Sequence, residues 1–275
     1  MKQFNIKRFG QLLKWWAMTN QGSLIKLAGG AVIITFLVEV LLMIDVLTVK
    51  DAALALSLEQ RQVENISGLM TFVFALCVTF SGSYMSSGLN KKQHREAFLM
   101  VPATQLEKYM LRWLYVVILI PVGIFLSFCL ADVLRMLIMF AIGPHEFVSV
   151  LSGFSKSYVI NIEDGQWLWS LSFLFVSALL FTQSFYILGG VLFRRHQFIL
   201  TSVAGILLSV VIIYCISYFA NNNFKLISGT NGVVAVHPLT YVVIAVNIVL
   251  ALVNYGLSYY FFKRMQIINN KWLNI

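Results

Sequence analysis

The stretch NKKQHREAFLMVPATQLEKYMLR, residues 90–112, is the only long charged passage between apolar runs of membrane length. Outside it the chain is strongly apolar: of its 275 residues 59% are hydrophobic and 11% are charged, with a mean hydropathy of +0.82. Soluble domains carry roughly 25% charged residues. The composition therefore excludes an ordinary soluble domain and predicts a polytopic membrane protein.

Six apolar segments are each long enough to cross a hydrocarbon layer of roughly 30 Å as a helix, which takes about 20 residues. We expect these spans at residues 27–49, 67–86, 110–136, 167–192, 198–220 and 239–262. The predicted fold class is therefore all-α. It comprises an amphipathic interface helix over residues 1–26, a six-helix transmembrane domain over residues 27–262 and a short tail over residues 263–275.

The first segment, residues 1–26, has the pattern of a helix lying flat on a membrane surface. Apolar residues recur there at helical spacing, with basic and polar residues between them: Phe9, Leu12, Leu13 and Trp16 against Lys7, Arg8, Gln11 and Lys14. Two interpretations stay open. The helix is a surface foot that sets the angle of the first span, or it holds a cytosolic partner.

The basic residues predict the orientation, because positively charged loops stay on the cytoplasmic side of a membrane. With the amino terminus inside, most of the 20 Lys and Arg residues fall in segments that face the cytoplasm. Both termini are therefore predicted to be cytosolic. The net charge of +9 follows from this bias, so we do not expect nucleic acid as a partner.

Within the charged stretch the sequence predicts two helices separated by a proline. Residues 91–100 can form a short helix, which Pro102 ends because the residue before a proline is pushed out of the helical region. Thr104 and Glu107 then form a capping-box pattern at the start of a second helix. That helix continues into the third span, so we expect a rigid elbow that transmits force to it. The simpler alternative is a loop that only joins two spans.

Two stretches carry a family resemblance. MVPATQLEKYMLRW, residues 100–113, resembles the loop between spans two and three of bacterial ATP-binding cassette type-2 permeases, where Leu-Pro-Ala-Ser is followed by Glu-Lys and an aromatic residue. GGVLFRRHQFILT, residues 189–201, is similar to the second cytosolic turn of the same group. Val101 stands where Leu is more usual and Thr104 where Ser is, and Thr104 keeps the capping hydroxyl.

The resemblance implies the transmembrane permease subunit of an ATP-driven exporter in the bacterial inner membrane. Members of this family pair as dimers, so the implied partners are a second permease copy, identical or different, and a separate cassette ATPase. ATP would be bound by that ATPase, and no cofactor is implied in this chain. Carried over by position, the elbow at residues 90–112 would couple to the ATPase through Lys91, Lys92, Arg95, Phe98, Met100, Pro102, Thr104, Glu107 and Lys108.

The sequence offers no support for catalysis within the chain. It lacks the GxxxxGK[ST] phosphate loop, so any ATPase must be another polypeptide. The four histidines fall on both sides of the membrane without an HExxH pattern, and the three cysteines lie inside predicted spans without CxxC spacing. We therefore expect neither an enzyme nor a metal site.

Ionisable residues within the spans are the remaining candidates for functional residues. Inserting a charge at the bilayer centre costs at least about 2.5 kcal/mol of free energy on insertion scales, so such residues need a compensating partner or a role. Glu39 lies near the middle of the first span and Asp45 nearer its outer end. Glu39 is expected either to line a transport pathway or to form a buried structural hydrogen bond. Asp132 and Arg135, three positions apart in the third span, are expected to pair with each other.

A second function from a different class stays open: an ion-coupled carrier or membrane sensor that works without an ATPase and uses Glu39 and Asp45 as proton-linked groups. The exporter subunit is favoured because it accounts for the elbow, the interface helix and the distribution of charge together. The two hypotheses differ in whether function survives without an ATPase, and in whether Glu39→Gln abolishes pH-dependent transport.

Overall fold

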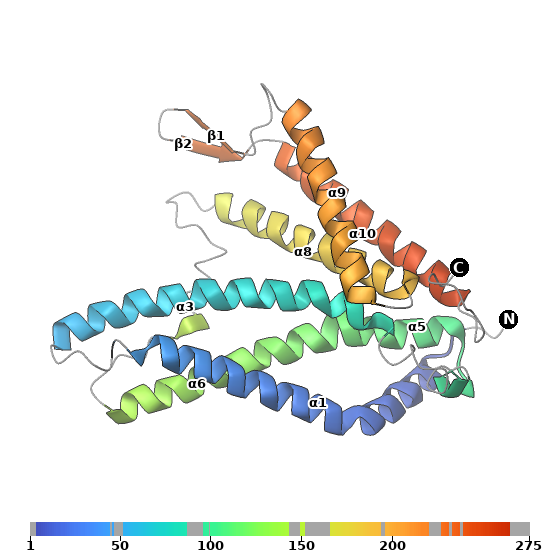
Figure 1. Cartoon of the computed structure of the whole chain (residues 1–275), viewed down its shortest axis with the longest axis horizontal. Coiled ribbons are helices and arrows are strands. Elements are labelled where there is room, and N and C mark those ends of the chain that lie inside the picture. The colour runs from blue at the N-terminus through green and yellow to red at the C-terminus, as the bar shows by residue number, and fades with distance from the viewer. Residues whose placement is uncertain are drawn as a thin grey trace. The chain divides into compact units, whose positions relative to one another are not determined.

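A computed structural model describes residues 4–44, 46, 52–86, 96–98, 100–142, 149–151, 166–193, 196–219, 227–230, 233–236 and 239–264. In these ranges the chain is helical apart from a small hairpin and short bends (Figure 1). Five of the helices there are long and apolar enough to cross a membrane: Ile6–Leu42, Ser57–Ser86, Gln105–Ile142, Ser172–Leu192 and Thr240–Lys263. The helical fold class is confirmed in this coarse form, and the apolar helices indicate a multi-pass membrane protein.

The sixth predicted span corresponds to helix α9, Gln197–Phe219. Its apolar stretch Gln197–Val211 is shorter than the other five. A total of six spans therefore stays a prediction.

Helix α1 runs without a break from Ile6 to Leu42. Asn5 caps its start, because its side-chain oxygen accepts a hydrogen bond from the Lys7 backbone N–H at 3.0 Å. The sequence predicted a separate surface helix ending at residue 26, but the chain stays helical through Gly29 and Gly30. At 1.5 Å per residue this helix is about 55 Å long, which exceeds the roughly 30 Å needed to cross the hydrocarbon layer.

A short antiparallel hairpin interrupts the predicted all-α fold. Strand β1, Ile227–Thr230, pairs with strand β2, Val233–Val236, and Thr230 lies opposite Val233. The sequence places Asn231-Gly232 between the strands and a run of mostly β-branched residues after it. Asn-Gly is the residue pair favoured in two-residue hairpin turns. The sequence therefore contained a strand signal that the all-helical prediction missed.

The chain divides into two compact units, each with its own buried core. Unit 1 comprises Met1–Leu13, Val78–Ile118 and Ile162–Ile275, and unit 2 comprises Lys14–Cys77 and Leu119–Asn161. The division passes through three helical runs of the chain, within α1, within α3 (Ala52–Ser81) and in the third predicted span.

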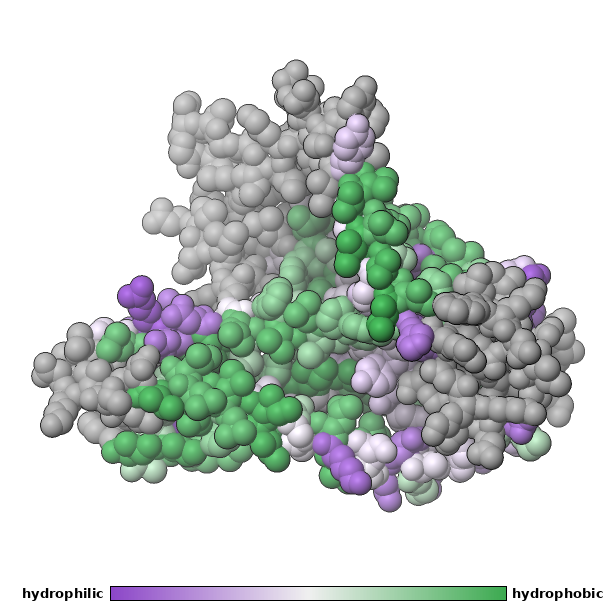
Figure 2. Space-filling model, viewed as in Figure 1, coloured by the Kyte–Doolittle hydropathy of each residue, from purple (hydrophilic) through white to green (hydrophobic). Residues whose placement is uncertain are grey.

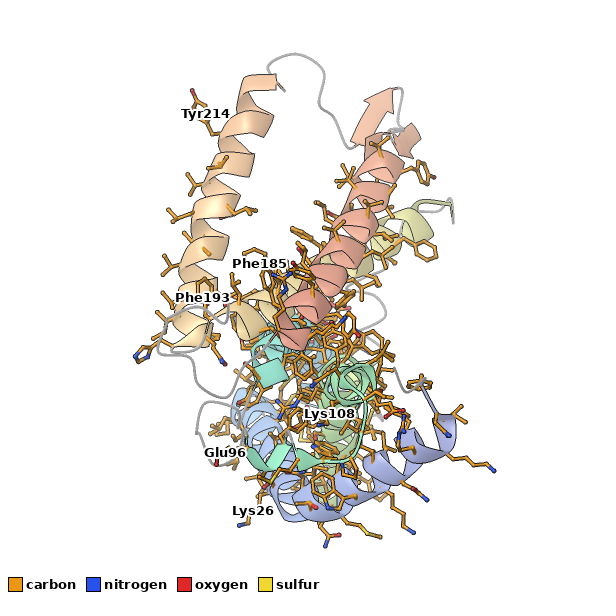
Figure 3. The ribbon with its side chains drawn as sticks, turned by 90° about the vertical axis from the view of Figure 1, so that its right-hand side faces the viewer. Lys26, Glu96, Lys108, Phe185, Phe193 and Tyr214 are labelled. Atoms are coloured by element: carbon orange, nitrogen blue, oxygen red, sulfur yellow. The ribbon has the colours of Figure 1, made fainter. Side chains whose placement is uncertain are left out.

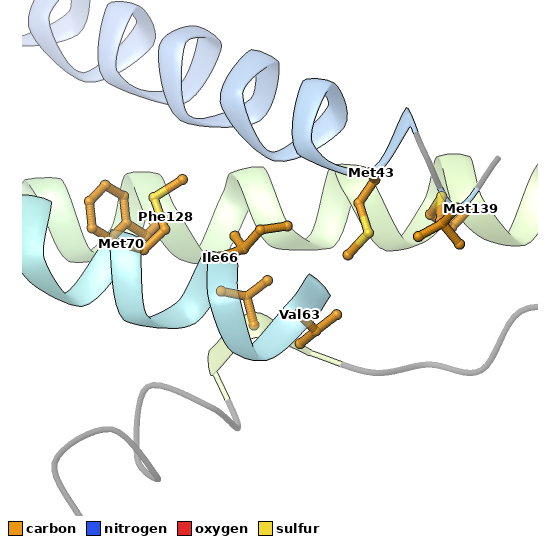
Figure 4. Close-up of a cluster of buried hydrophobic side chains, with 8 residues drawn as sticks. Met43, Val63, Ile66, Met70, Phe128 and Met139 are labelled. Carbon is orange, nitrogen blue, oxygen red and sulfur yellow. The ribbon is translucent and has the colours of Figure 1, made fainter. Parts of the chain in front are cut away.

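In unit 2 the core lies between α1, α3 and α6 (Ile120–Ile142). Helix α3 contributes Val63, Ile66 and Met70, whose spacing of three and four residues puts them on one helix face. They pack with Met43, the residue that follows α1, and with Phe128 and Met139 from α6 (Figure 4).

In unit 1 helix α8, Gln166–Leu192, packs against α9, against α10 (Leu239–Lys263) and against the short 3-10 helix η1 (Gly82–Ser86). Two glycines permit the close approach. A Cβ atom on Gly82 would lie 2.6 Å from the Gln183 carbonyl oxygen, and a Cβ atom on Gly189 would overlap the Thr201 side chain.

Helices α8 and α10 are also joined by two side-chain hydrogen bonds spaced seven residues apart. The amide of Asn247 donates to the Ser177 hydroxyl at 3.4 Å, and the amide of Asn254 donates to the Ser184 hydroxyl at 3.1 Å. Polar pairs of this kind fix helix–helix contacts in a lipid environment.

Large apolar side chains remain exposed along the long helices, and apolar residues cover much of the coloured surface in Figure 2. On α9 the exposed positions include Ile206 and Leu207, and Tyr214 points away from the helix (Figure 3). Exposure of this extent is expected where helices face lipid.

Candidate functional site

The break at Pro102 lies where the sequence predicted it. Residues 96–98 and 100 are helical, and the chain then bends over residues 101–103, where the Ala103 N–H donates to the Val101 carbonyl at 2.8 Å. Pro102 is exposed. The predicted coupling residues Lys91, Lys92 and Arg95 lie outside the described residues.

The predicted capping box at the start of helix α5, Gln105–Leu114, is confirmed. Thr104 is the N-cap residue with extended backbone angles, and its hydroxyl accepts from the Glu107 N–H at 3.3 Å. In return, the Glu107 carboxylate accepts from the Thr104 N–H at 2.8 Å. The two side chains therefore fix where α5 begins.

Glu107 also joins α5 to the start of α1, a contact that sequence reasoning missed. Its carboxylate accepts from Arg8 Nε at 2.8 Å and from Arg8 Nη2 at 2.5 Å, as a two-pronged ion pair. It accepts a further bond from the Asn5 N–H at 3.0 Å. Glu107 is fully buried. Arg8 and Glu107 are 99 positions apart, so no local pattern connects them.

Phe98 links the short helical segment of the elbow to α5. The Arg112 guanidinium lies 4.4 Å from the centre of the Phe98 ring and the Lys108 ammonium lies 5.5 Å from it, so both cations face the ring. Arg112 also donates to the carbonyl of Met85 in η1 at 2.8 Å. Lys108 is buried on α5 (Figure 3). The elbow is therefore tied to η1, which follows α3, as well as to α5.

An aromatic cluster connects the same elbow to α10. The Tyr109 hydroxyl donates to the Tyr255 carbonyl at 3.1 Å, and the Tyr109 ring lies 5.3 Å from Tyr259 and 5.5 Å from Phe262. The Phe98 ring in turn lies 6.2 Å from Phe262. These contacts place the last long helix in direct contact with the elbow, which the sequence did not predict.

The predicted coupling residues that the structure describes differ in how exposed they are. Met100, at 81% exposure, and Pro102 are on the surface, where another protein can touch them. Glu107 and Lys108 are buried, so their side chains can affect coupling only through the residues that they hold in place. Phe98 and Thr104 are half-buried.

A second cluster of ionisable residues lies in unit 2. The predicted pair is confirmed: Arg135 Nη2 lies 2.8 Å from the Asp132 carboxylate, and both side chains are almost fully buried. Asp132 also accepts from the Ser149 hydroxyl at 2.6 Å and from the Val150 N–H at 3.2 Å. Both oxygens of the Asp132 carboxylate therefore accept hydrogen bonds from residues of unit 2.

Glu39 faces this pair from α1. Its Oε2 atom lies 4.0 Å from Arg135 Nε, so Arg135 supplies an opposite charge, which residues 27–42 of α1 around Glu39 do not contain. That oxygen accepts no hydrogen bond from any described side chain or backbone group. Asp45, the other acidic residue predicted in the first span, lies outside the described residues.

Glu39 lines a cavity of about 10 Å³, together with Met70, Phe128, Asp132, Val150 and Leu151. A cavity of this size holds about one water molecule. In this conformation the cluster is a buried ion pair beside a water-sized space, and a transported solute has no room there.

Comparisons with family models, with curated proteins and with solved structures return no match for the chain.

Proposed function

We propose that the chain is the transmembrane permease subunit of an ATP-driven exporter, coupled through the elbow at residues 90–112 to a separate cassette ATPase. One observation carries this proposal. The elbow combines an exposed tip at Met100 and Pro102 with a capped helix that belongs to the membrane-length helical run Gln105–Ile142. The resemblance of residues 100–113 to type-2 permeases supports the same function.

The contacts of the elbow suit the transmission of force. A push on the tip reaches α5 through the stacking of Phe98 on Arg112, and it reaches α1 through the bonds of Glu107 to Arg8 and Asn5. Charged groups that are buried and fully hydrogen-bonded hold a single geometry, because breaking any bond leaves an unpaired group. The elbow is therefore expected to move as one piece with the helices it holds.

We also propose that the chain has six membrane spans, with α9 as the fifth, and that both termini lie in the cytoplasm of a bacterial cell. The part of α1 up to Lys26, which is continuous with the first span, acts as the interface segment, since Trp15 and Ile25 are exposed and the sequence has no Asp or Glu before Glu39. A second permease copy completes the pore.

Cysteine crosslinking of the full-length protein in its native membranes tests this function. The native cysteines are replaced by alanine, and Met100→Cys is introduced at the exposed tip. We expect this variant to crosslink to a protein that carries a phosphate-loop ATPase sequence, identified by mass spectrometry. Leu130→Cys is the matched control, because Leu130 is also exposed, at 57%, but lies on α6, outside residues 90–112.

The proposal fails if Met100→Cys gives no ATPase crosslink under conditions in which transport is intact. It also fails if Leu130→Cys crosslinks equally well, since contact would then not depend on the elbow.

The alternative, an ion-coupled carrier or sensor without an ATPase, is supported by one observation: the buried Glu39 oxygen that accepts no hydrogen bond from the described residues. The water-sized cavity beside it argues against passage of a solute through that point. Transport that needs no ATPase and is lost in Glu39→Gln would favour the alternative.

A further inference from the structure

The third predicted span is not a uniform α-helix. Between α5 and α6 the chain forms a five-residue π-helix, η2, over Tyr115–Leu119. Such π-helical turns are wider than α-helical turns, are rare, and occur mostly as single turns inside α-helices, frequently at functional sites. η2 directly follows α5, the helix that the elbow holds at its start.

Pro121 accounts for the break in the hydrogen-bond ladder. Proline has no backbone N–H, so it cannot donate to the carbonyl one turn earlier. Pro121 lies in the first turn of α6, directly after η2, and in the π-helical register of η2 its acceptor would be the residue five positions before it, Val116. Val116 is fully buried, so its carbonyl needs another donor.

Gln183 on α8 supplies that donor. Its Nε2 atom lies 3.3 Å from the Val116 carbonyl oxygen and 3.0 Å from the Ser81 hydroxyl oxygen, and its two amide hydrogens can serve both acceptors at once. The Ser81 hydroxyl also lies 3.2 Å from the Val116 carbonyl, but it has a single hydrogen and lies closer to the Val78 carbonyl, at 2.7 Å. Gln183 is therefore the main partner of the freed carbonyl.

The surroundings hold one side of η2 and leave the other side open. Gln183 is buried. A Cβ atom on Gly82 would collide with the backbone carbonyl of Gln183, so α8 and η1 pack tightly there. Ile118 and Leu119 are exposed, at 45% and 41%. The division between the two compact units also falls between Ile118 and Leu119.

We infer that η2 is the hinge of the third span and that Gln183 is the positioning residue that holds it in the present state. Bending at Tyr115–Leu119 costs little backbone hydrogen bonding, because Pro121 has already removed one bond of the ladder and a side chain replaces it. The inference rests on the proposed function only for the source of the force, which would be the elbow.

Spin-label distances across η2 test the hinge in the full-length chain, reconstituted in lipid nanodiscs without any partner. The native cysteines are replaced by alanine, and labels are attached at Met110→Cys and Leu130→Cys, which are about 20 residues apart and therefore about 30 Å apart in a straight α-helix. We expect a broad or two-peaked distance distribution in the parent. Pro121→Ala restores the missing N–H, so it is expected to collapse the distribution to one narrow peak near 30 Å.

Hydrogen exchange tests the role of Gln183 separately. Gln183→Met keeps the side-chain volume but removes both donors, so exchange of the amides in residues 115–122 is expected to rise about fivefold. Thr182→Val is the matched control: it is the neighbouring residue on α8 and bonds to its own helix and to Thr79. The control is expected to leave the exchange of these amides unchanged.

The hinge is overturned if the parent already gives a single narrow distance that Pro121→Ala does not alter, or if Gln183→Met and Thr182→Val exchange alike. These results do not depend on an ATPase. If the spin-label distances and the hydrogen exchange behave as expected but no ATPase crosslinks at Met100, the proposed function fails and the hinge stands. If the ATPase crosslinks and the hinge signals are missing, the hinge alone is wrong.

Discussion

Among single residues, Glu107 is expected to matter most for stability and coupling. Its buried carboxylate accepts hydrogen bonds from the Asn5 N–H, from the Arg8 guanidinium and from the Thr104 N–H at the start of α5. Glu107→Ala removes them all and leaves the Thr104 N–H without its partner. The loss of the cap alone costs about 1 kcal/mol of stability. We expect a lower Tm for the full-length protein in detergent and at least a severalfold loss of elbow-dependent ATP turnover.

A charge swap separates the ion pair from the cap. Arg8→Glu and Glu107→Arg are each expected to lower Tm, and the double variant is expected to recover part of the loss, since the pair is restored in reverse. Recovery should stay partial, because a guanidinium at position 107 has no acceptor for the Asn5 N–H. Lys14→Ala, at an exposed basic residue on the same helix as Arg8, is the control that should change little. Additive losses in the double variant would show that the pair contributes nothing.

At the scale of helices, Phe98 connects the tip of the elbow to α5 and α10. Phe98→Ala is expected to keep the ATPase bound, since the exposed tip is unchanged, but to lower ATP-driven transport about tenfold. Phe98→Leu keeps most of the volume and loses only the attraction between ring and cations, so its effect should be within severalfold. Phe72→Ala, at an exposed position on α3, is the control. Loss of ATPase binding in Phe98→Ala would mean that Phe98 is a contact residue and not a link.

The same elements show what the sequence can and cannot reveal. The capping box and the Asp132–Arg135 pair are local, three positions apart, and both were predicted. The bond from Tyr109 to Tyr255 joins positions 146 apart, and nothing in either helix singles out its partner. The continuity of α1 was missed because the first apolar run begins at Leu27, directly after the basic Lys26, and this change of composition suggested a boundary that the helix Ile6–Leu42 does not have.

For the whole molecule, labelling from outside the cell tests whether the chain has five or six spans. If α9 crosses the membrane, the hairpin and the end of α10, which follow it, each lie on the opposite side from where they would lie if it does not. If α9 crosses, the hairpin β1–β2 lies outside and the end of α10 lies inside, as the basic residues Lys263 and Arg264 favour. Ser228→Cys in β1 and Arg264→Cys after α10, each in a background without native cysteines, report the two sides. We expect a membrane-impermeant maleimide to label Ser228→Cys in intact cells and Arg264→Cys only after permeabilisation.

Met100→Cys fixes the reference side in the same experiment, since the elbow is proposed to face the cytoplasm, and it should be labelled only after permeabilisation. The reverse pattern, with Ser228→Cys protected and Arg264→Cys labelled in intact cells, would leave five crossings and would put the end of α10 outside. Because Phe262 packs against the elbow residues Phe98 and Tyr109, the end of α10 and the elbow must lie on one side. An odd number of crossings would therefore contradict this packing as well as the charge distribution, and we predict six crossings on both grounds.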